Sequence, residues 1–481
     1  MKRKLLSILL CLAMALSLLP TAALADETPS EGGESAPAVE YVAQIGETKY
    51  ATLQAAIDAG ERKTVTLLAD TRENVTIDKA MTLDLNGHTL NGSTGERKPA
   101  LTVSNTRVTV QDSSEAQTGT IKRDDTAENS GISSHYVIDV QGGSGFLLFK
   151  SGNVTNGSGA GGTNGASLVR VGDDKNKVQP TMTITGGTFT QDNFIVLKVD
   201  YGTLYVKGGT INSKNSYAVQ NWRNATIKDN AIVNGNVSSW SYEGGPGAQT
   251  TISGGTVNGN VEAISYDGKA GKPALVSISG GTVNGTLIAG IYNSATEPSK
   301  EMATIEVTSG TFKNDPSKYV VENSSVAKND DGTFGVAKAY LAKVGDTGYY
   351  TMDEARKAQS TSGEDIVLLR DYTTGSPFRS GISARVVDLN GHTWTCTGKD
   401  ANSAAFEISN PNASLTVKNG TIVSSQLVGL IPSASSLTGP ITYDNSSLTF
   451  ENVEMSTTAT SGIETNGNNT NDSVTLKNST L

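Results

Sequence analysis

Cysteine and histidine are almost missing from this sequence of 481 residues, and their scarcity excludes several kinds of stabilisation and chemistry. The two cysteines are Cys11 and Cys396. Cys11 lies in an N-terminal segment that we expect to be removed, so the mature chain cannot form an intramolecular disulfide. Zinc-ligand spacings and calcium-roll repeats are also missing from the sequence. Packing and backbone hydrogen bonding must therefore stabilise the fold.

Positive charge is also scarce. The chain has 38 Lys and Arg residues against 48 Asp and Glu, a formal net charge of −10. Loss of Lys2, Arg3 and Lys4 with the N-terminal segment changes this charge to −13. Nucleic acid and anionic lipid are poor partners for such a chain, because their binding relies on Lys and Arg. Only 18% of residues are charged and there are 52 glycines, which favours β-structure with many turns over helices.

The N-terminus predicts export. A basic start precedes an apolar run from Leu5 to Leu19 and the cleavage pattern Ala23-Leu24-Ala25, so residues 1–25 are expected to be a signal peptide. The alternative is an uncleaved anchor, although the run is short for a membrane span. Residues 26–40 are acidic and rich in Pro, Gly and Ser, which predicts a disordered linker. Nothing after the signal resembles a membrane span, so we expect a secreted or cell-surface protein.

An internal duplication divides the remainder. Residues 41–92 reappear at 340–398, which predicts a first unit at 41–338 and a second at 339–481. Each unit should open with a short capping helix. Leu53, Ala56 and Ile57 form a helical stripe closed by Gly60, and the second copy has a capping-box pattern at Thr351 and Glu354. The alternative for these helices is a binding surface for a partner helix.

A shorter repeat fills both units: apolar, any, apolar, four mostly small or polar residues, apolar. One face of each strand then points into a core, and Gly-Gly-Thr triplets supply a bend. Anchor positions follow at steps of 35, 22, 21, 25, 26 and 29 residues, at Phe149, Ile184, Val206, Ile227, Ile252, Ile278 and Val307. The same spacing fits the duplicated segments, with Leu85 and Leu389 as their anchors. Constant strands with variable turns predict a β-solenoid with all anchors in one core. An array of β-sandwiches is the structural alternative. Recurring Asn and Thr should form side-chain ladders.

The paired Asp-Leu-Asn-Gly-His-Thr segments and the Ile-Ser-Gly-Gly-Thr-Val-Asn-Gly segments carry a family resemblance. The chain resembles the large, repetitive, signal-bearing surface proteins of Gram-positive gut bacteria, whose repeats look like the pectate-lyase-like right-handed parallel β-helix. The resemblance covers residues 41–481 and implies an all-β, right-handed parallel β-helix. It implies little about function, because this fold hosts lyases, hydrolases and adhesins alike.

Catalytic patterns of this fold are not recognisable in the sequence. The hydrolase branch implies Asn-Thr-Asp, His-Gly and Arg-Ile-Lys motifs, which are missing, and the Asp-Asp pairs fall in turn-like stretches. We therefore expect a non-catalytic protein; the alternative is a polysaccharide lyase or glycoside hydrolase. The recurring histidines are interpreted as parts of a duplicated structural turn, Asn86, Gly87, His88, Asn390, Gly391 and His392. His135 has no recognisable partner. No cofactor is expected, apart from a weak calcium site at an outward-facing Asp84 or Asp388.

Aromatic residues provide the binding candidates. They fall on adjacent repeats or their loops and could stack on sugar rings: Tyr205, Tyr217, Trp222, Trp240, Tyr242 and Tyr266. The simpler interpretation, which we favour, is that long turns partly bury these rings. The leading functional hypothesis is an adhesive or structural stalk that contacts carbohydrate or host or bacterial surface proteins. Leu481 ends the sequence at an apolar repeat position, which predicts a fragment or a covering partner. Ligand identity, attachment and oligomeric state cannot be derived from these residues.

Overall fold

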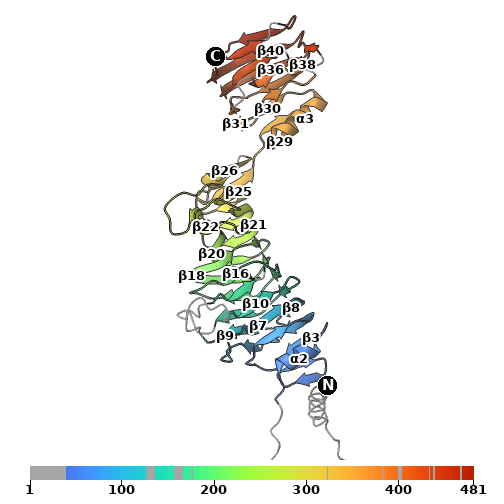
Figure 1. Ribbon diagram of the computed structural model, residues 1–481, viewed down its shortest axis with the longest axis vertical. Helices are drawn as coiled ribbons and strands as arrows, with labels where there is room; N and C mark the ends of the chain where they lie inside the picture. Colours follow the sequence, from blue (N-terminus) through green and yellow to red (C-terminus); the bar gives the residue numbers. More distant parts are fainter. Residues whose placement is uncertain are drawn as a thin grey trace, which may run out of the picture. The chain divides into compact units, whose positions relative to one another are not determined.

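The computed structural model (Figure 1) describes residues 40–125, 136–156, 166–173, 175, 177–321, 323–382, 384–398, 403–432, 434–436, 439–465 and 468–481. Strands dominate these residues, and only two α-helices occur among them. Most strands pair in parallel within large sheets. The expected all-β class is confirmed. Two hydrophobic clusters lie within the described chain, one drawn from Ala43 to Val336 and the other from Leu341 to Met455.

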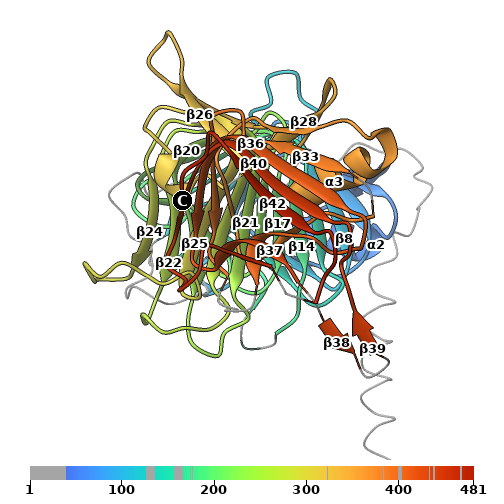
Figure 2. The same cartoon turned by 90° about the horizontal axis from the view of Figure 1, so that it is seen from above.

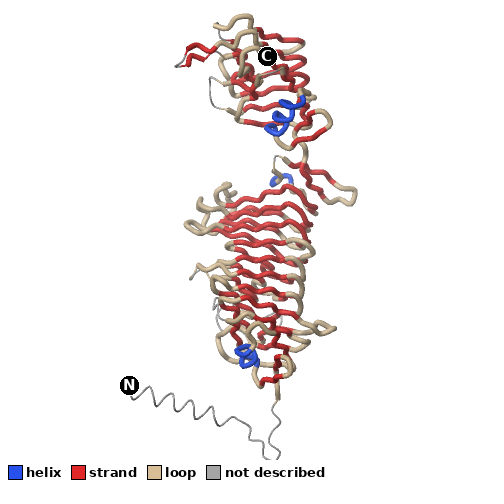
Figure 3. The backbone as a smooth tube through the Cα atoms, turned by 90° about the vertical axis from the view of Figure 1, so that its right-hand side faces the viewer, coloured by secondary structure: helices blue, strands red, loops and turns tan. Residues whose placement is uncertain are grey.

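The described strands between residues 64 and 312 form three parallel ladders, and each ladder joins strands from successive turns of the chain (Figure 3). The first ladder contains β3 (Thr64–Leu67), β5 (Met81–Asp84), β8 (Arg107–Gln111), β11 (Phe146–Phe149), β14 (Thr181–Ile184), β17 (Thr203–Val206), β19 (Asn224–Ile227), β21 (Ala248–Val257), β23 (Ala274–Val283) and β25 (Ala303–Phe312). The second contains β6 (Thr89–Asn91), β9 (Thr120–Arg123), β12 (Asn153–Asn156), β15 (Thr188–Thr190), β18 (Thr210–Asn221), β20 (Ile232–Ser241) and the later parts of β21, β23 and β25.

The third ladder positions the candidate site. It contains β4 (Val75–Ile77), β7 (Leu101–Ser104), β10 (Ile138–Gln141), β13 (Val169–Val171), β16 (Leu197–Val199), the later parts of β18 and β20, β22 (Val261–Ser265) and β24 (Leu287–Ile291). Seen from above, the strands of successive turns lie over one another (Figure 2).

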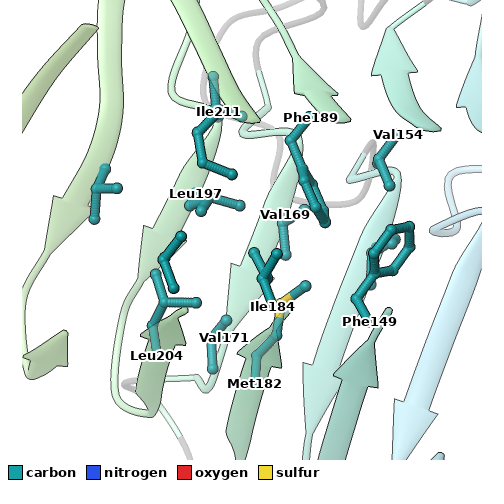
Figure 4. Close-up of a cluster of buried hydrophobic side chains, with 14 of the residues drawn as sticks. Phe149, Val154, Val169, Val171, Met182, Ile184, Phe189, Leu197, Leu204 and Ile211 are labelled. Atoms are coloured by element: carbon teal, nitrogen blue, oxygen red, sulfur yellow. The ribbon is translucent and has the colours of Figure 1, made fainter. Parts of the chain in front are cut away.

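The strand register confirms the repeat steps. Phe149 pairs with Ile184, and Ile184 with Val206. The same column continues through Ile227, Ile252, Ile278 and Val307. All these side chains are buried in one cluster, at most 1% exposed. Figure 4 shows Phe149, Ile184 and Leu204, which come from three successive turns, within that cluster. The second glycine of each Gly-Gly-Thr bend has positive φ, from 73° to 83°, at Gly187, Gly209, Gly255 and Gly281, where a side chain would be strained.

The N-terminal end of the first cluster is antiparallel and helical. Strand β1 (Ala43–Ile45) pairs with β2 (Thr48–Tyr50) and with β3. Helix α2 (Leu53–Ala59) begins after Thr52, whose side chain accepts a hydrogen bond from Ala55 N, and it buries the predicted stripe of Leu53, Ala56 and Ile57. The Glu73 carboxylate accepts hydrogen bonds from the first helical amides. At the other end, η2 (Ser317–Tyr319) precedes the antiparallel pair β26 (Ser324–Lys328) and β27 (Phe334–Lys338).

The register of the duplicated Asn-Gly-His-Thr segments differs from our expectation by two residues. We expected Leu85 and Leu389 to be the anchors, but Leu83 pairs with Val110 and Val387 pairs with Val417. Leu85 instead precedes a turn closed by His88 N donating to Leu85 O. This turn is two residues longer than the Gly-Gly-Thr bend. The apolar pattern therefore looks the same in the sequence although the strand ends two residues earlier, which keeps the same side chains facing the core.

Asparagine side chains form the expected side-chain ladder along the second strand ladder. Asn234 donates to Asn212 at 2.8 Å and accepts from Asn258 at 2.7 Å, and Asn284 donates to Asn258 at 2.7 Å. We predict that Asn234→Ala lowers the free energy of unfolding by about 1–3 kcal/mol. The substitution removes two hydrogen bonds and leaves the side chains of Asn212 and Asn258 each without one partner. Asn284→Ala, which removes one ladder bond, should cost about half as much. Urea unfolding followed by circular dichroism measures both; equal costs would contradict the ladder's contribution.

The second cluster repeats the same plan. It begins with β28 (Ala342–Val344) and β29 (Thr347–Tyr349), and with α3 (Met352–Ser362), whose capping box joins Thr351 and Glu354 as predicted. Its strands stack in three parallel rows. The first row contains β30 (Ile366–Leu368), β33 (Arg385–Asp388), β36 (Ser414–Ser424), β40 (Ser447–Thr457) and β42 (Ser473–Lys477). The second contains β31 (Tyr372–Thr374), β34 (Thr393–Cys396) and β36, and the third contains β32 (Phe378–Arg379), β35 (Ala404–Glu407), β37 (Leu427–Ile431) and β41 (Ile463–Thr465). The hairpin β38 (Ala434–Ser436) and β39 (Gly439–Ile441) is separate.

Candidate functional site

Six aromatic side chains meet at the third ladder. We call them the aromatic cluster: Tyr217, Trp222, Trp240, Tyr242, Tyr266 and Tyr292. Four of them directly follow strands of this ladder, and Tyr217 and Trp240 lie within β18 and β20. The ladder itself positions several of them. Trp222 N donates to Val199 O, Tyr266 N to Ser241 O, and Tyr292 N to Ser265 O, so each ring follows a strand that is hydrogen bonded to the preceding turn. Parallel strands in register therefore bring these rings to one edge of the sheet.

Trp240 lies at the centre of the cluster. Its ring centroid is 5.4 Å from that of Trp222, 5.3 Å from Tyr292, 6.0 Å from Tyr217 and 6.3 Å from Tyr266. Only 4% of Trp240 is exposed, so this binding candidate does not face solvent, and its ring instead supports the others. The outer rings are Tyr266 and Tyr292, 52% and 46% exposed, which stack at 5.5 Å with an interplanar angle of 16°.

The structure separates Tyr205 from this group and adds Tyr292. Tyr205 is on β17 in the first ladder, where Lys207 Nζ lies 5.6 Å from its ring centroid. Tyr292 was not among the sequence candidates, although its spacing from Tyr242 and Tyr266 matches the repeat steps. Ser241 pairs with Ser265 and Ser265 with Ile291, so Tyr242, Tyr266 and Tyr292 are successive members of one column at the strand ends.

A pocket of about 480 Å³ opens beside the cluster, and we call it the aromatic pocket. It is lined by Lys198, Asp200, Gln220, Trp222, Tyr242, Pro246, Tyr266 and Asp267. Its charges are largely compensated. Lys198 Nζ lies 3.0 Å from Asp200 Oδ1, and the Asp267 carboxylate accepts a hydrogen bond from Glu243 N, which lowers the pKa of Asp267. Aromatic faces beside fixed hydrogen-bonding groups suit a ligand with apolar faces and hydroxyl edges.

A buried carboxyl group, that of Glu262, lies close enough to the aromatic cluster to affect Tyr217. Glu262 is 8% exposed, and burial raises its pKa. Burial, together with Glu262 and Tyr292, raises the pKa of Tyr217 to about 12. The tyrosine hydroxyl therefore remains protonated at neutral pH and can donate a hydrogen bond.

Glu262 predicts a pH-dependent stability. Because folding raises the pKa of this carboxyl, the folded state binds the proton more tightly, and stability falls as the pH rises from the unfolded pKa through the folded pKa. We expect Glu262→Gln to raise the thermal midpoint at about pH 7.5, where the carboxyl is ionised in the unfolded wild type, and to leave it nearly unchanged at about pH 4. Differential scanning calorimetry at both pH values measures this. A midpoint raised equally at both would show that packing, rather than charge, causes the gain.

The two duplicated turns have closely similar geometry. Asn86 Nδ2 donates to Leu67 O and Asn390 Nδ2 to Leu368 O, both at 3.0 Å. The equivalent histidines each lie near an aspartate: His88 Nδ1 is 3.6 Å from Asp70 Oδ1, and His392 Nδ1 is 3.4 Å from Asp371 Oδ1. Gly87 and Gly391 have positive φ. These contacts explain the recurring Asn and His side chains by their place in the turn. His135 lies outside the described residues.

The proposed calcium position does not have the expected geometry. Asp84 is 6% exposed instead of facing outward. Its Oδ1 accepts hydrogen bonds from Asn86 N and Ser113 N, because the longer turn folds over this carboxylate. Asp388 is more exposed and its Oδ1 accepts from Asn390 N. Within the described residues no group of three or more His, Cys, Asp or Glu side chains is placed to hold a metal ion.

No helix among the described residues has the length and apolar character needed to cross a membrane. Comparison of the chain with family models, with curated proteins and with solved structures gives no match.

Proposed function

We propose that the chain is a secreted or cell-surface protein whose stacked strands form a right-handed parallel β-helix, and that it acts as an adhesive or structural stalk module that binds glycans at the aromatic pocket. The parallel ladders and the resemblance of the repeats support the β-helix. The N-terminal sequence supports export. Stacking of successive turns fills the core and pairs the backbone groups, which stabilises such a stalk without covalent cross-links.

The aromatic pocket is the observation that carries the binding function. Trp222 and Tyr266 line it, and their centroids are 6.1 Å apart at an interplanar angle of 63°. Rings set at such an angle can contact a sugar from two sides. The Trp222 indole N–H donates to Gln220 Oε1 at 3.2 Å, which fixes the orientation of the indole. A preordered ring loses little entropy when a ligand binds.

We predict that Trp222→Ala weakens glycan binding by at least about tenfold, because truncation of a buried aromatic contact typically costs more than about 1.4 kcal/mol. Glycan-array screening of the purified mature protein, followed by calorimetric titration of the best ligand, measures the loss. The matched control is Tyr205→Ala, which removes an aromatic ring from the first ladder. Unchanged affinity in Trp222→Ala, or an equal loss in Tyr205→Ala, would contradict binding at this pocket.

The same experiment addresses the catalytic alternative. Incubation of the mature protein with the array glycans, with and without calcium, should leave them intact. Release of unsaturated uronate or reducing ends would replace the binding role by a lyase or hydrolase activity.

A further inference from the structure

A second pocket lies next to the aromatic pocket, and we propose that it binds an acidic substituent, a carboxylate or a sulfate, on the glycan held by the aromatic pocket. This inference rests on the proposed glycan-binding function and names the ligand class. The second pocket is about 480 Å³ in volume, and Tyr242 and Pro246 line both pockets. We call it the basic pocket, because Lys177, Arg223 and Lys272 line it and none of its lining residues is acidic.

The charges of the two pockets differ. The lysine of the aromatic pocket, Lys198, is paired with Asp200, and on the neighbouring turn Lys269 is paired with Glu243. By contrast, no ion pair within the described chain joins a carboxylate to any of the three cations of the basic pocket. The whole chain has a net charge of −10. An uncompensated group of cations on an acidic chain is a local site where an anion is favoured.

Arg223 has hydrogen-bonding capacity that the protein does not use. Its guanidinium makes one long hydrogen bond, from Nη1 to Pro246 O at 3.4 Å, and Cζ lies 5.6 Å from the centroid of Tyr201. Its Nε is buried without a hydrogen-bond partner in the described residues. A guanidinium has five N–H donors in a fixed fork that matches the oxygens of a carboxylate or sulfate. The Tyr201 ring orients this fork. Because Nε is buried, the donors that can meet a ligand are those of Nη1 and Nη2.

The chain order explains how one ligand can occupy both pockets. Trp222 and Arg223 are adjacent residues after β18, and they line the aromatic and the basic pocket respectively. Tyr242 and Pro246 lie on the turn after β20 and form the shared boundary. A sugar ring against Trp222 would thus direct a charged substituent of the same or the next residue towards Arg223.

The test uses the full mature protein and an array on which each neutral oligosaccharide is matched by its C6 uronate and by its 6-O-sulfate. The wild type should bind the acidic members at least about tenfold more tightly than the neutral one, since a charge-assisted hydrogen bond contributes about 1.5–3 kcal/mol. This preference should shrink as salt is raised, because screening weakens the exposed part of the attraction. The stronger of the two acidic series identifies carboxylate or sulfate as the group bound.

Arg223→Gln combined with Lys272→Gln should abolish the preference and leave binding of the neutral glycan unchanged. The control is Lys269→Gln, which removes one positive charge, against two in the double variant, from the turn of Lys272 but from outside the pocket. Its thermal midpoint and that of the double variant establish folding. Equal binding of neutral and acidic members by the wild type, or a preference that survives the double variant, overturns the inference while the glycan-binding function stands. Failure of the wild type to bind any array member overturns both.

Discussion

Phe149→Ala should lower the free energy of unfolding by about 3–5 kcal/mol, the range for removal of a fully buried phenylalanine side chain. Phe149 is 0% exposed. Its ring centroid lies 4.8 Å from that of Phe189 on the next turn, and Gly187 of the intervening bend lies so close that an added Cβ would be 2.7 Å from Phe149 Cε1. Thr188 N donates to Gly152 O and Thr210 N to Gly187 O. Because these bonds to the neighbouring turns hold the bend in place, truncation should leave a cavity.

Phe146 is the matched control for this prediction. It is on the same strand, but it belongs to the opposite, partly exposed face, and Arg107 Cζ lies 4.0 Å from its ring centroid. Phe146→Ala should cost only about 1 kcal/mol, mainly the cation–π contact. Urea unfolding of both variants, followed by circular dichroism, gives the two free energies. Similar costs would mean that the two faces of β11 are not divided into core and surface.

Arg170→Ala should cost about 3–5 kcal/mol, because it leaves a buried carboxylate without its cation. Arg170 Nε and Nη2 donate to Asp139 at 2.9 and 2.6 Å, and the Asp139 side chain is 2% exposed. Burial lowers the pKa of Arg170, but the hydrogen bonds and charge of Asp139 outweigh this and raise the pKa above its usual value. The guanidinium also lies 4.7 Å from the centroid of Tyr136.

The double variant Asp139→Ala with Arg170→Ala separates charge from packing at this pair. It should recover much of the loss, since no lone charge is buried. Urea unfolding followed by circular dichroism gives the free energies of the single and double variants. Costs that add in the double variant would assign the loss to packing.

The repeat pattern was sufficient to predict the stacked core, because a strand's side chains alternate with a period that does not depend on distant contacts. Ile184, Val206, Ile252 and Ile278 were expected in one core and are buried there. The helix after Thr52 was equally local, since its cap and its apolar stripe lie within eight residues. The spacing rule was wrong at Leu85, because apolar spacing alone cannot distinguish a two-residue displacement when the turn also lengthens.

The site was only partly predictable. Five of the six aromatic candidates meet on one edge, but exposure could not be derived from residue type. Trp240 is covered because neighbouring turns place four rings around it. Asp84 is likewise covered by a turn that its own hydrogen bonds stabilise. The cations Lys177, Arg223 and Lys272 lie on three turns of unequal length, and a sequence gives no register for residues outside the strands.

The variable turns have a consequence for how specificity can diverge. Both pockets are lined largely by residues that follow the strands of the third ladder, whereas the ladder hydrogen bonds and the buried columns lie within the strands. Exchange of one turn, such as residues 242–247, would alter the recognition surface without disturbing the register on either side. A scaffold of this kind can acquire a new ligand by loop replacement alone, and it offers positions for grafting peptides in protein engineering.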